Sequence, residues 1–172
     1  MGKKDFDEFL EKDRANTHLE PRVDWTGRRD EWLEYLREFY KLVAEFLSDY
    51  VASGDVSTEY EDKYINEELV GRYPAQSLHL RIRGRDVILD PVGTNVIGAR
   101  GRVDMTGPAG TVRFVLIGWD VIRVRTRRER GAEAETNIPE WVWKIATPPP
   151  RISYLDLNAE SFLDALMEVI NA

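Results

Sequence analysis

Residues 79–90 read HLRIRGRDVILD, and this stretch decides the fold. Apolar and polar side chains alternate on both sides of its glycine, which is typical of two strands that each bury one face. Gly84 and Arg85 suit the two central positions of a type II′ turn, because that turn needs glycine at the first of them. The stretch therefore predicts a β-hairpin with a two-residue turn.

This turn fixes which residues face each other across the hairpin. The expected pairs are Arg83 with Asp86, Ile82 with Val87, Arg81 with Ile88, Leu80 with Leu89, and His79 with Asp90. The leucines, Ile82 and Val87 then share the face that packs on the core, and the charged side chains share the opposite face.

The period of two continues to residue 127 and predicts further antiparallel strands. The segment GPAG at 107–110 closes a second hairpin, after a third strand that follows the turn PVGTN at 91–95. Its expected pairs are Met105 with Val112, Asp104 with Arg113, and Val103 with Phe114. We expect a fifth strand to run through DVIRVRTR at 120–127, with Gly118 at a bend or bulge.

A long amphipathic helix is predicted for residues 28–54. Apolar side chains recur there at intervals of three and four residues: Trp32, Leu36, Phe39, Val43, Phe46 and Tyr50. Asp24 or Thr26 can cap its start, and Gly54 offers the left-handed residue that closes helices. We expect the aromatic stripe to cover a sheet core, with a peptide-binding or dimerising face as the alternative.

The end of the chain predicts a strand at EWVWKIAT (140–147), a rigid extended crossing at PPP (148–150), and a short strand before a second helix that Asn158 caps. Elsewhere the pattern is weaker. Residues 6–10 carry a short helical stripe, and 17–27 indicate a loop. Between 55 and 75 the pattern is mixed: DVSTEYED resembles an edge strand, INEELVGRY a helical turn or two, and Pro74 a break in the chain.

These elements predict the fold class. We expect a single α+β domain over residues 1–172, with an antiparallel meander sheet of about five to seven strands. The long N-terminal helix and the C-terminal helix should pack on one face of the sheet.

Composition narrows the class of protein. With 42% hydrophobic and 32% charged residues, the chain has the profile of a folded globular protein. It has no cysteine, which excludes disulfides, thiolate zinc sites and a cysteine nucleophile, and is compatible with the reducing cytoplasm. The longest apolar run, FVLI at 114–117, is far too short to cross a bilayer. We therefore expect a cytoplasmic protein that does not engage a membrane.

Charge is distributed unevenly along the chain. Residues 1–71 hold 10 basic and 19 acidic side chains, residues 72–130 hold 12 and 5, and residues 131–172 hold 2 and 7. A basic middle between acidic ends indicates either a basic face for an external anion or a sheet neutralised by its own acidic surroundings. The net charge of −7 favours the second interpretation.

The basic candidates form what we call the arginine stripe: Arg81, Arg83, Arg123, Arg125, Arg127 and Arg128. Alternate arginines are expected on the solvent side of a sheet, where the aliphatic stem covers the strand and the guanidinium stays hydrated. The functional alternative is that the stripe binds an anion or a partner, such as the phosphates of a nucleic acid. Sheets that bind single strands interleave aromatic side chains with basic ones, and here the aromatic side chains lie elsewhere in the sequence.

Catalytic interpretations have less support. His79 facing Asp90 is the one histidine–carboxylate pair that the register yields, and we interpret it as a structural cross-strand pair. His18 lies in the expected loop without an assigned partner. A metal-dependent nuclease would combine Asp104 with Glu140 and Lys144, but only if EWVWK lies beside Asp104. The glycines of VGTNVIGARG lack the Gly-Lys-Ser/Thr of a phosphate loop, so the sequence predicts no cofactor and no metal.

Two functional classes remain from the sequence. The first is a non-enzymatic protein-interaction module, which binds another protein or a second copy of itself. The second is a nucleic-acid-binding module that uses the arginine stripe, and a nuclease-like enzyme is a distant third. The acidity of the chain favours the first class.

We expect the simultaneous replacement of Arg123, Arg125 and Arg127 by glutamine to change stability only slightly, because exposed ion pairs contribute about 0 to 1 kcal/mol each. Thermal melts of the two proteins test this expectation. The wild type should also show no salt-dependent affinity for DNA or RNA in a fluorescence-anisotropy titration. A micromolar dissociation constant that the triple variant raises about tenfold would favour the nucleic-acid interpretation instead.

Overall fold

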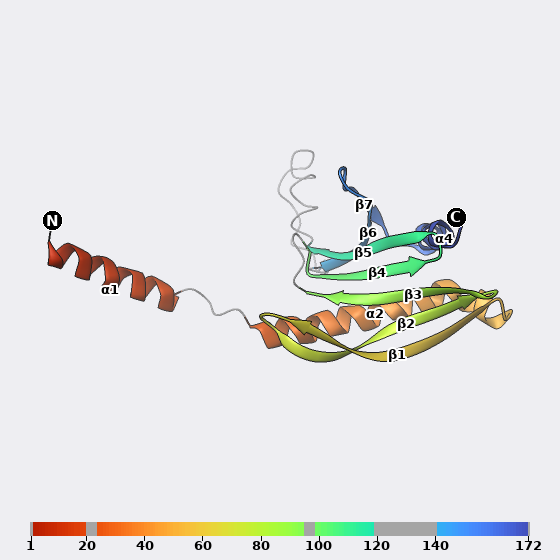
Figure 1. Cartoon of the computed structure of the whole chain (residues 1–172), viewed down its shortest axis with the longest axis horizontal. Helices are drawn as coiled ribbons and strands as arrows, with labels where there is room; N and C mark the ends of the chain where they lie inside the picture. The colour runs from red at the N-terminus through yellow and green to blue at the C-terminus, as the bar shows by residue number, and fades with distance from the viewer. Residues whose placement is uncertain (1, 20–23, 95–98, 119–140, 172) are drawn as a thin grey trace, which may run out of the picture.

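The structure is a computed structural model that describes residues 2–19, 24–94, 99–118 and 141–171. The helices are α1 (Lys3–Leu19), α2 (Trp25–Ala52) and α4 (Ala159–Ile170). The strands are β1 (Val56–Glu67), β2 (Gly71–Ile82), β3 (Arg85–Gly93), β4 (Gly101–Gly107), β5 (Gly110–Gly118), β6 (Trp141–Ala146) and β7 (Tyr154–Asp156). Figure 1 shows their arrangement.

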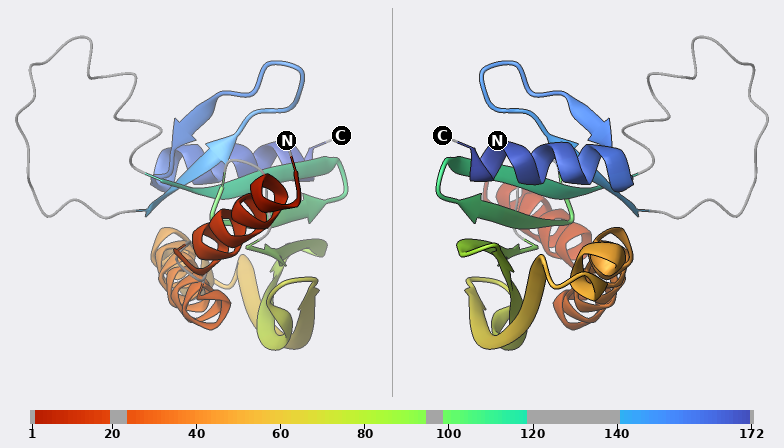
Figure 2. Two further views of the ribbon diagram at one scale, coloured as in Figure 1. Left: turned by 90° about the vertical axis from the view of Figure 1, so that its left-hand side faces the viewer. Right: turned by 90° about the vertical axis from the view of Figure 1, so that its right-hand side faces the viewer.

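The seven strands form one antiparallel sheet in the order β1-β2-β3-β4-β5-β6-β7. Every strand pairs with its neighbour in sequence, so the sheet is an open meander. Figure 2 looks along α2 and shows strands both beside this helix and above it. The predicted α+β class and the predicted meander are therefore confirmed.

Helix α2 forms where the sequence predicts it. Asp24 caps its start and accepts a hydrogen bond of 2.9 Å from the backbone N–H of Gly27, and Gly54 adopts a φ of 83° just after its end. Its buried residues are Trp32, Leu36, Phe39, Tyr40, Val43 and Leu47. The predicted stripe therefore lies in the core from Trp32 to Val43, whereas Tyr50 at its end is 42% exposed. No helix in the described part of the chain is long and apolar enough to cross a membrane.

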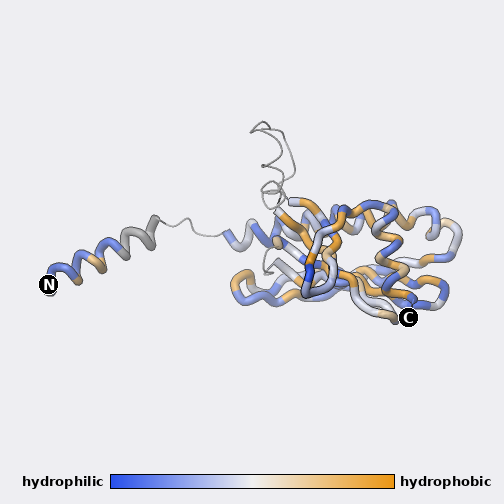
Figure 3. The backbone as a smooth tube through the Cα atoms, turned by 90° about the horizontal axis from the view of Figure 1, so that it is seen from above, coloured by the Kyte–Doolittle hydropathy of each residue, from blue (hydrophilic) through white to orange (hydrophobic). Residues whose placement is uncertain are grey.

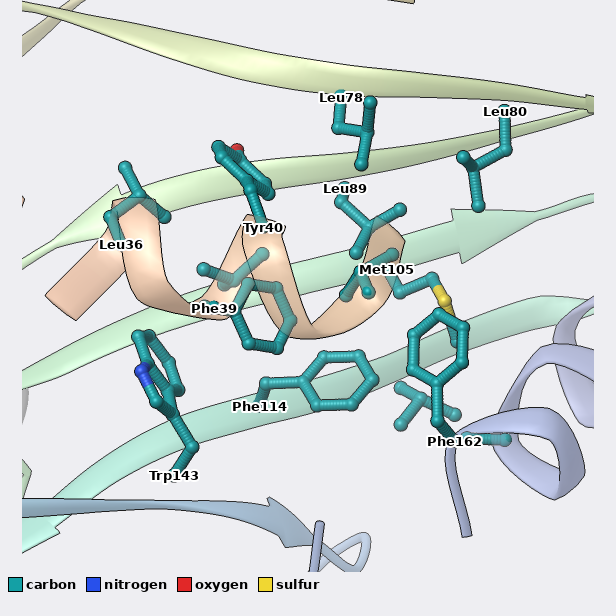
Figure 4. Close-up of a cluster of buried hydrophobic side chains, with 14 of the residues drawn as sticks. Leu36, Phe39, Tyr40, Leu78, Leu80, Leu89, Met105, Phe114, Trp143 and Phe162 are labelled. Atoms are coloured by element: carbon teal, nitrogen blue, oxygen red, sulfur yellow. The ribbon is translucent and has the colours of Figure 1, made fainter. Parts of the chain in front are cut away.

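An aromatic row joins the two core helices to the sheet (Figure 4). The Phe39 ring of α2 lies 4.7 Å from that of Trp143 on β6 and 5.1 Å from that of Phe114 on β5, measured between ring centroids. Phe114 in turn lies 5.9 Å from Phe162 on α4. Both helices therefore pack on the same face of the sheet, as predicted.

The first predicted hairpin is formed by β2 and β3, but its predicted register is wrong by two residues. Ile82 pairs with Arg85, so the two turn residues are Arg83 and Gly84. Both have positive φ, 47° and 85°, which defines a type I′ turn with glycine at the second central position. Arg83 tolerates this backbone because its N–H donates to the carbonyl oxygen of Asp55 at 3.2 Å and its guanidinium pairs with the same residue at 3.0 Å.

The second hairpin has the predicted register. Met105 pairs with Val112, Asp104 with Arg113, and Val103 with Phe114. The glycines of GPAG form the closing pair, which leaves proline and alanine as the turn. The predicted strand through residues 120–127 lies outside the described residues.

Residues 55–75 form strands rather than a helical turn and a break. Ile65 and Glu67 belong to β1, a three-residue turn follows, and Gly71 opens β2 with a φ of 89°, as in hairpins that carry a glycine bulge. Pro74 lies inside β2 opposite Tyr64. It is tolerated because β3 pairs with β2 only from Leu78 onward, so no neighbouring strand needs the missing N–H.

The face of the β1–β2 hairpin that packs on the core changes along its length. Leu78 and Leu80 of β2 face the core near the turn that leads to β3. Tyr73 and Ala75 face it at the far end of the hairpin, which is the end with the β1–β2 turn. Side chains alternate between the two faces of a strand, so these pairs belong to opposite faces. The right-handed twist of a long two-stranded ribbon brings first one face and then the other against the core.

The predicted C-terminal strands and helix are confirmed, but the three prolines at 148–150 do not form an extended crossing. They lie in a bend of the loop between β6 and β7, because the chain reverses direction between these antiparallel strands. β6 and β7 form a hairpin, and α4 begins at an N-cap in which Asn158 and Ser161 exchange hydrogen bonds of 2.9 Å. At the other end of the chain, α1 is longer than predicted and includes Thr17 to Leu19, with His18, which the sequence placed in a loop. Its Phe6 and Phe9 are each 62% exposed, and Figure 3 colours the N-terminal part of this helix as mainly hydrophilic.

Phe39→Ala should lower the free energy of unfolding by about 3 to 5 kcal/mol, because the removed ring leaves a cavity between α2 and the sheet. Urea denaturation measures the loss. Tyr50→Ala, in the exposed last turn of the same helix, is the control and should change stability by less than about 1 kcal/mol. Equal losses for the two variants would contradict the packing described above.

Candidate interaction surface

The edge hairpin, residues 56–82 of β1 and β2, carries the most exposed aromatic side chains of the sheet. Tyr60 is 47% exposed and Tyr64 is 61% exposed. The guanidinium carbon of Arg72 lies 4.2 Å from the centroid of the Tyr64 ring, which is a cation–π contact. Tyrosine and arginine are the residue types that protein interfaces favour.

The change of the core-facing side along the hairpin explains why these tyrosines are exposed. Both belong to the same face of β1 as Val56, which is buried near the start of the strand. At the far end the opposite face packs on the core through Ile65, so Tyr64 points away from it. Tyr60 lies between these regions, and its ring meets that of Tyr40 on α2 edge to face at 5.6 Å.

A buried carboxylate fixes the far end of the hairpin. The side chain of Glu67 accepts hydrogen bonds from the Tyr73 hydroxyl at 2.5 Å, the Thr94 hydroxyl at 3.0 Å and the Thr94 N–H at 2.8 Å. Glu67 and Thr94 are 8% and 9% exposed, which is uncommon for polar residues and is stabilised here by these bonds. The bonds tie the β1–β2 turn to the end of β3.

Two buried tyrosines belong to the same framework. Burial raises the pKa of Tyr73 well above its usual value, and the hydrogen bond to the Glu67 carboxylate adds to this effect. Burial also raises the pKa of Tyr40, with a smaller contribution from the charge of Asp90. Tyr40 donates to the backbone oxygen of Gln76 at 2.6 Å, so α2 holds β2 from within the core. Both hydroxyls remain protonated donors at neutral pH.

Opposite charges are paired across the outer face of the sheet, the face turned away from α2 and α4. Lys63 pairs with Asp90 at 2.5 Å, Arg102 binds both oxygens of Asp104 at 2.7 Å, and Lys144 pairs with Asp156. The hydrogen bond to Asp104 is the main cause of the raised pKa of Arg102.

The two described members of the arginine stripe each lie beside a carboxylate. Arg81 lies opposite Asp86 in the sheet, and Arg83 pairs with Asp55. The hydrogen bonds from Ser53 and Arg83 hold the pKa of Asp55 below its usual value. The other four arginines, Arg123, Arg125, Arg127 and Arg128, lie outside the described residues.

The structure does not bring His79 and Asp90 together. The shift of the register by two residues places His79 opposite Ile88, and its Nε2 lies 2.8 Å from a carboxylate oxygen of Glu61 on β1. Asp90 lies opposite Asp104 and interacts with Lys63 instead.

The arrangement required for a nuclease centre is also not formed. β5 separates β4 from β6, so Lys144 lies opposite Val115 and not beside Asp104. Glu140 lies outside the described residues. Within the described ranges, no group of three or more histidine, aspartate and glutamate side chains is arranged to hold a metal ion.

Comparisons of the chain with models of protein families, with curated proteins and with solved structures returned no match. The candidate surface therefore rests on the geometry of the chain alone.

Sequence reasoning missed Tyr60, Tyr64, Glu67 and Thr94. Gly71 was the available signal, because glycine after a short polar segment is typical of a hairpin with a bulge. That hairpin would have placed the two tyrosines, which are four residues apart, on one face of an edge strand. Nothing in the sequence indicated that Glu67 meets Thr94.

Tyr73→Phe should lower the free energy of unfolding by about 1.5 to 3 kcal/mol, because it removes a hydrogen bond to a buried charged group. Urea denaturation at neutral pH checks this. Tyr64→Phe removes the same hydroxyl from an exposed tyrosine and should change stability by less than about 0.5 kcal/mol. Similar values for the two variants would show that the Glu67 carboxylate does not anchor the hairpin.

Proposed function

We propose that this chain is a non-enzymatic protein-interaction module whose partner docks on the edge hairpin. The observation that carries the proposal is the exposure of Tyr60 and Tyr64 on an edge strand that is buried at both of its ends. Large aromatic side chains with a polar tip lose little conformational entropy on binding and provide much of the energy of protein interfaces.

The anchoring of the hairpin supports the proposal. Tyr40 holds its middle, and the Glu67 carboxylate holds its far end. A surface whose backbone is already ordered has less entropy to lose when a partner binds. The exposed tyrosines therefore project from a backbone that is anchored on the core.

The electrostatics support a protein partner over a nucleic acid. The hairpin exposes Glu59, Glu61 and Asp62, and these carboxylates repel phosphates. Arg81 and Arg83 lie next to carboxylates, which reduces the field available to a polyanion. A nucleic-acid module remains the alternative proposal and would have to rely on Arg123, Arg125, Arg127 and Arg128.

A cytoplasmic location is part of this proposal, since a chain without cysteine requires no oxidising compartment. The partner is taken to be a different protein. Self-association through the same hairpin is the competing outcome that the experiment below distinguishes.

A photoreactive phenylalanine analogue at position 64 should form a covalent adduct with one defined protein in the producing cell, because this side chain lies at the centre of the proposed surface. Mass spectrometry identifies the cross-linked peptide. The same analogue at position 50 is the matched control, since Tyr50 is a 42% exposed tyrosine on another element. Equal adducts at both positions, an adduct with nucleic acid, or an adduct only with a second copy of the chain would contradict the proposal.

A further inference from the structure

We infer that the partner adds an extended strand to the open edge of β1, and that this strand alternates basic with apolar residues. The inference rests on the proposed function and specifies the partner's chemistry. It depends on the backbone at the edge, on the charges along one side of β1 and on the tyrosines along the other.

The turn at Arg83 and Gly84 determines which β1 backbone groups face the open edge. The closing pair of a two-residue turn is hydrogen-bonded, so Ile82 bonds to β3, as do Leu80 and Leu78. The residues between them bond to β1 instead.

The same alternation can be followed along β1. His79 lies opposite Glu59, and Ser77 lies opposite Glu61, so these β1 residues direct their backbone groups toward β2. Tyr60, Asp62 and Tyr64 then direct their N–H and C=O groups outward.

The two edges of the sheet differ in what they offer a partner. β7 has 3 residues, which is too short to template a long strand. β1 has 12 residues and pairs with β2 without a register shift, so its outward-facing groups are evenly spaced. It contains no proline, which is one of the residues that protect such edges, and the ammonium group of its lysine, Lys63, binds Asp90. β1 is therefore the regular edge to which a strand can add.

One side of β1 is acidic. Glu59 is exposed, and the side chain of Glu61 is 67% exposed although it lies 2.8 Å from His79 Nε2. The next residue on this side, Lys63, contributes no free positive charge, because its ammonium group binds Asp90 and the backbone oxygen of Pro91. A strand beside β1 would place its own side chains next to these carboxylates, where lysine or arginine is favourable.

The other side of β1 is aromatic. Tyr60 and Tyr64 lie on it with Asp62 between them, and Asp62 already accepts a hydrogen bond from the amide of Gln76 at 3.0 Å. Apolar side chains of the added strand would cover the tyrosine rings. Since side chains alternate along a strand, a partner that matches both sides must alternate basic with apolar residues.

The probe is a short fluorescent peptide that alternates arginine with valine, titrated into the full chain and followed by anisotropy. We expect saturable binding. The double variant Glu59→Lys, Glu61→Lys should raise the dissociation constant about tenfold, because two favourable charge contacts become repulsive. The control is Asp164→Lys, Glu168→Lys on the exposed face of α4, which makes the same change of net charge away from β1 and should leave binding unchanged.

The backbone contacts are tested by methylation of the peptide. Only alternate N–H groups of an added strand face β1, so N-methyl groups on one alternate set should abolish binding and those on the other set should be tolerated. No binding of the unmethylated peptide, equal weakening by both methylated peptides, or equal weakening by the two lysine variants would overturn the inference. A specific adduct at position 64 together with any of these results would leave the proposed function standing and refute only the added strand.

Discussion

The packing of the Phe39 ring between α2 and the sheet is the interaction on which the rest of this structure depends. The ring is fully buried and touches Trp143 and Phe114, which come from strands far along the chain. Tyr40, the next residue, is directed toward the edge hairpin, where its hydroxyl binds the backbone of Gln76. Two adjacent residues of one helix thus contact both halves of a seven-stranded sheet.

This coupling gives the edge hairpin its character as a surface. An isolated two-stranded ribbon is marginally stable in water. Here the ribbon packs on the core with one face near its start and with the other near its end, so it gains stability along its whole length while leaving Tyr60 and Tyr64 exposed. The buried Glu67 carboxylate then joins its far end to Thr94. Anchoring contacts and exposed aromatic side chains therefore occur in the same element.

Particular residues show how far the sequence could predict this arrangement. GPAG gave the correct register because its proline and alanine are enclosed by two glycines, which leaves one two-residue turn. The segment RGR at 83–85 did not give the correct register, because Gly84 suits both the first central position of a type II′ turn and the second central position of a type I′ turn. The two registers differ by two residues, keep the same side chains on each face and cannot be separated by hydrophobic pattern. The candidate surface could not be predicted either, since it depends on the twist of the ribbon and on a contact between Glu67 and Thr94 across 27 residues of sequence.

The bond between the indole N–H of Trp143 and the backbone oxygen of Tyr35 joins residues 108 positions apart. A ribosome makes the N-terminal partner first, so α2 leaves the exit tunnel long before β6 and α4 have been synthesised. Until then its aromatic stripe has neither Trp143 nor Phe162 to cover it. The nascent chain therefore carries this stripe without Trp143 and Phe162 until β6 and α4 are made, and chains that terminate before β6 leave part of the aromatic row uncovered.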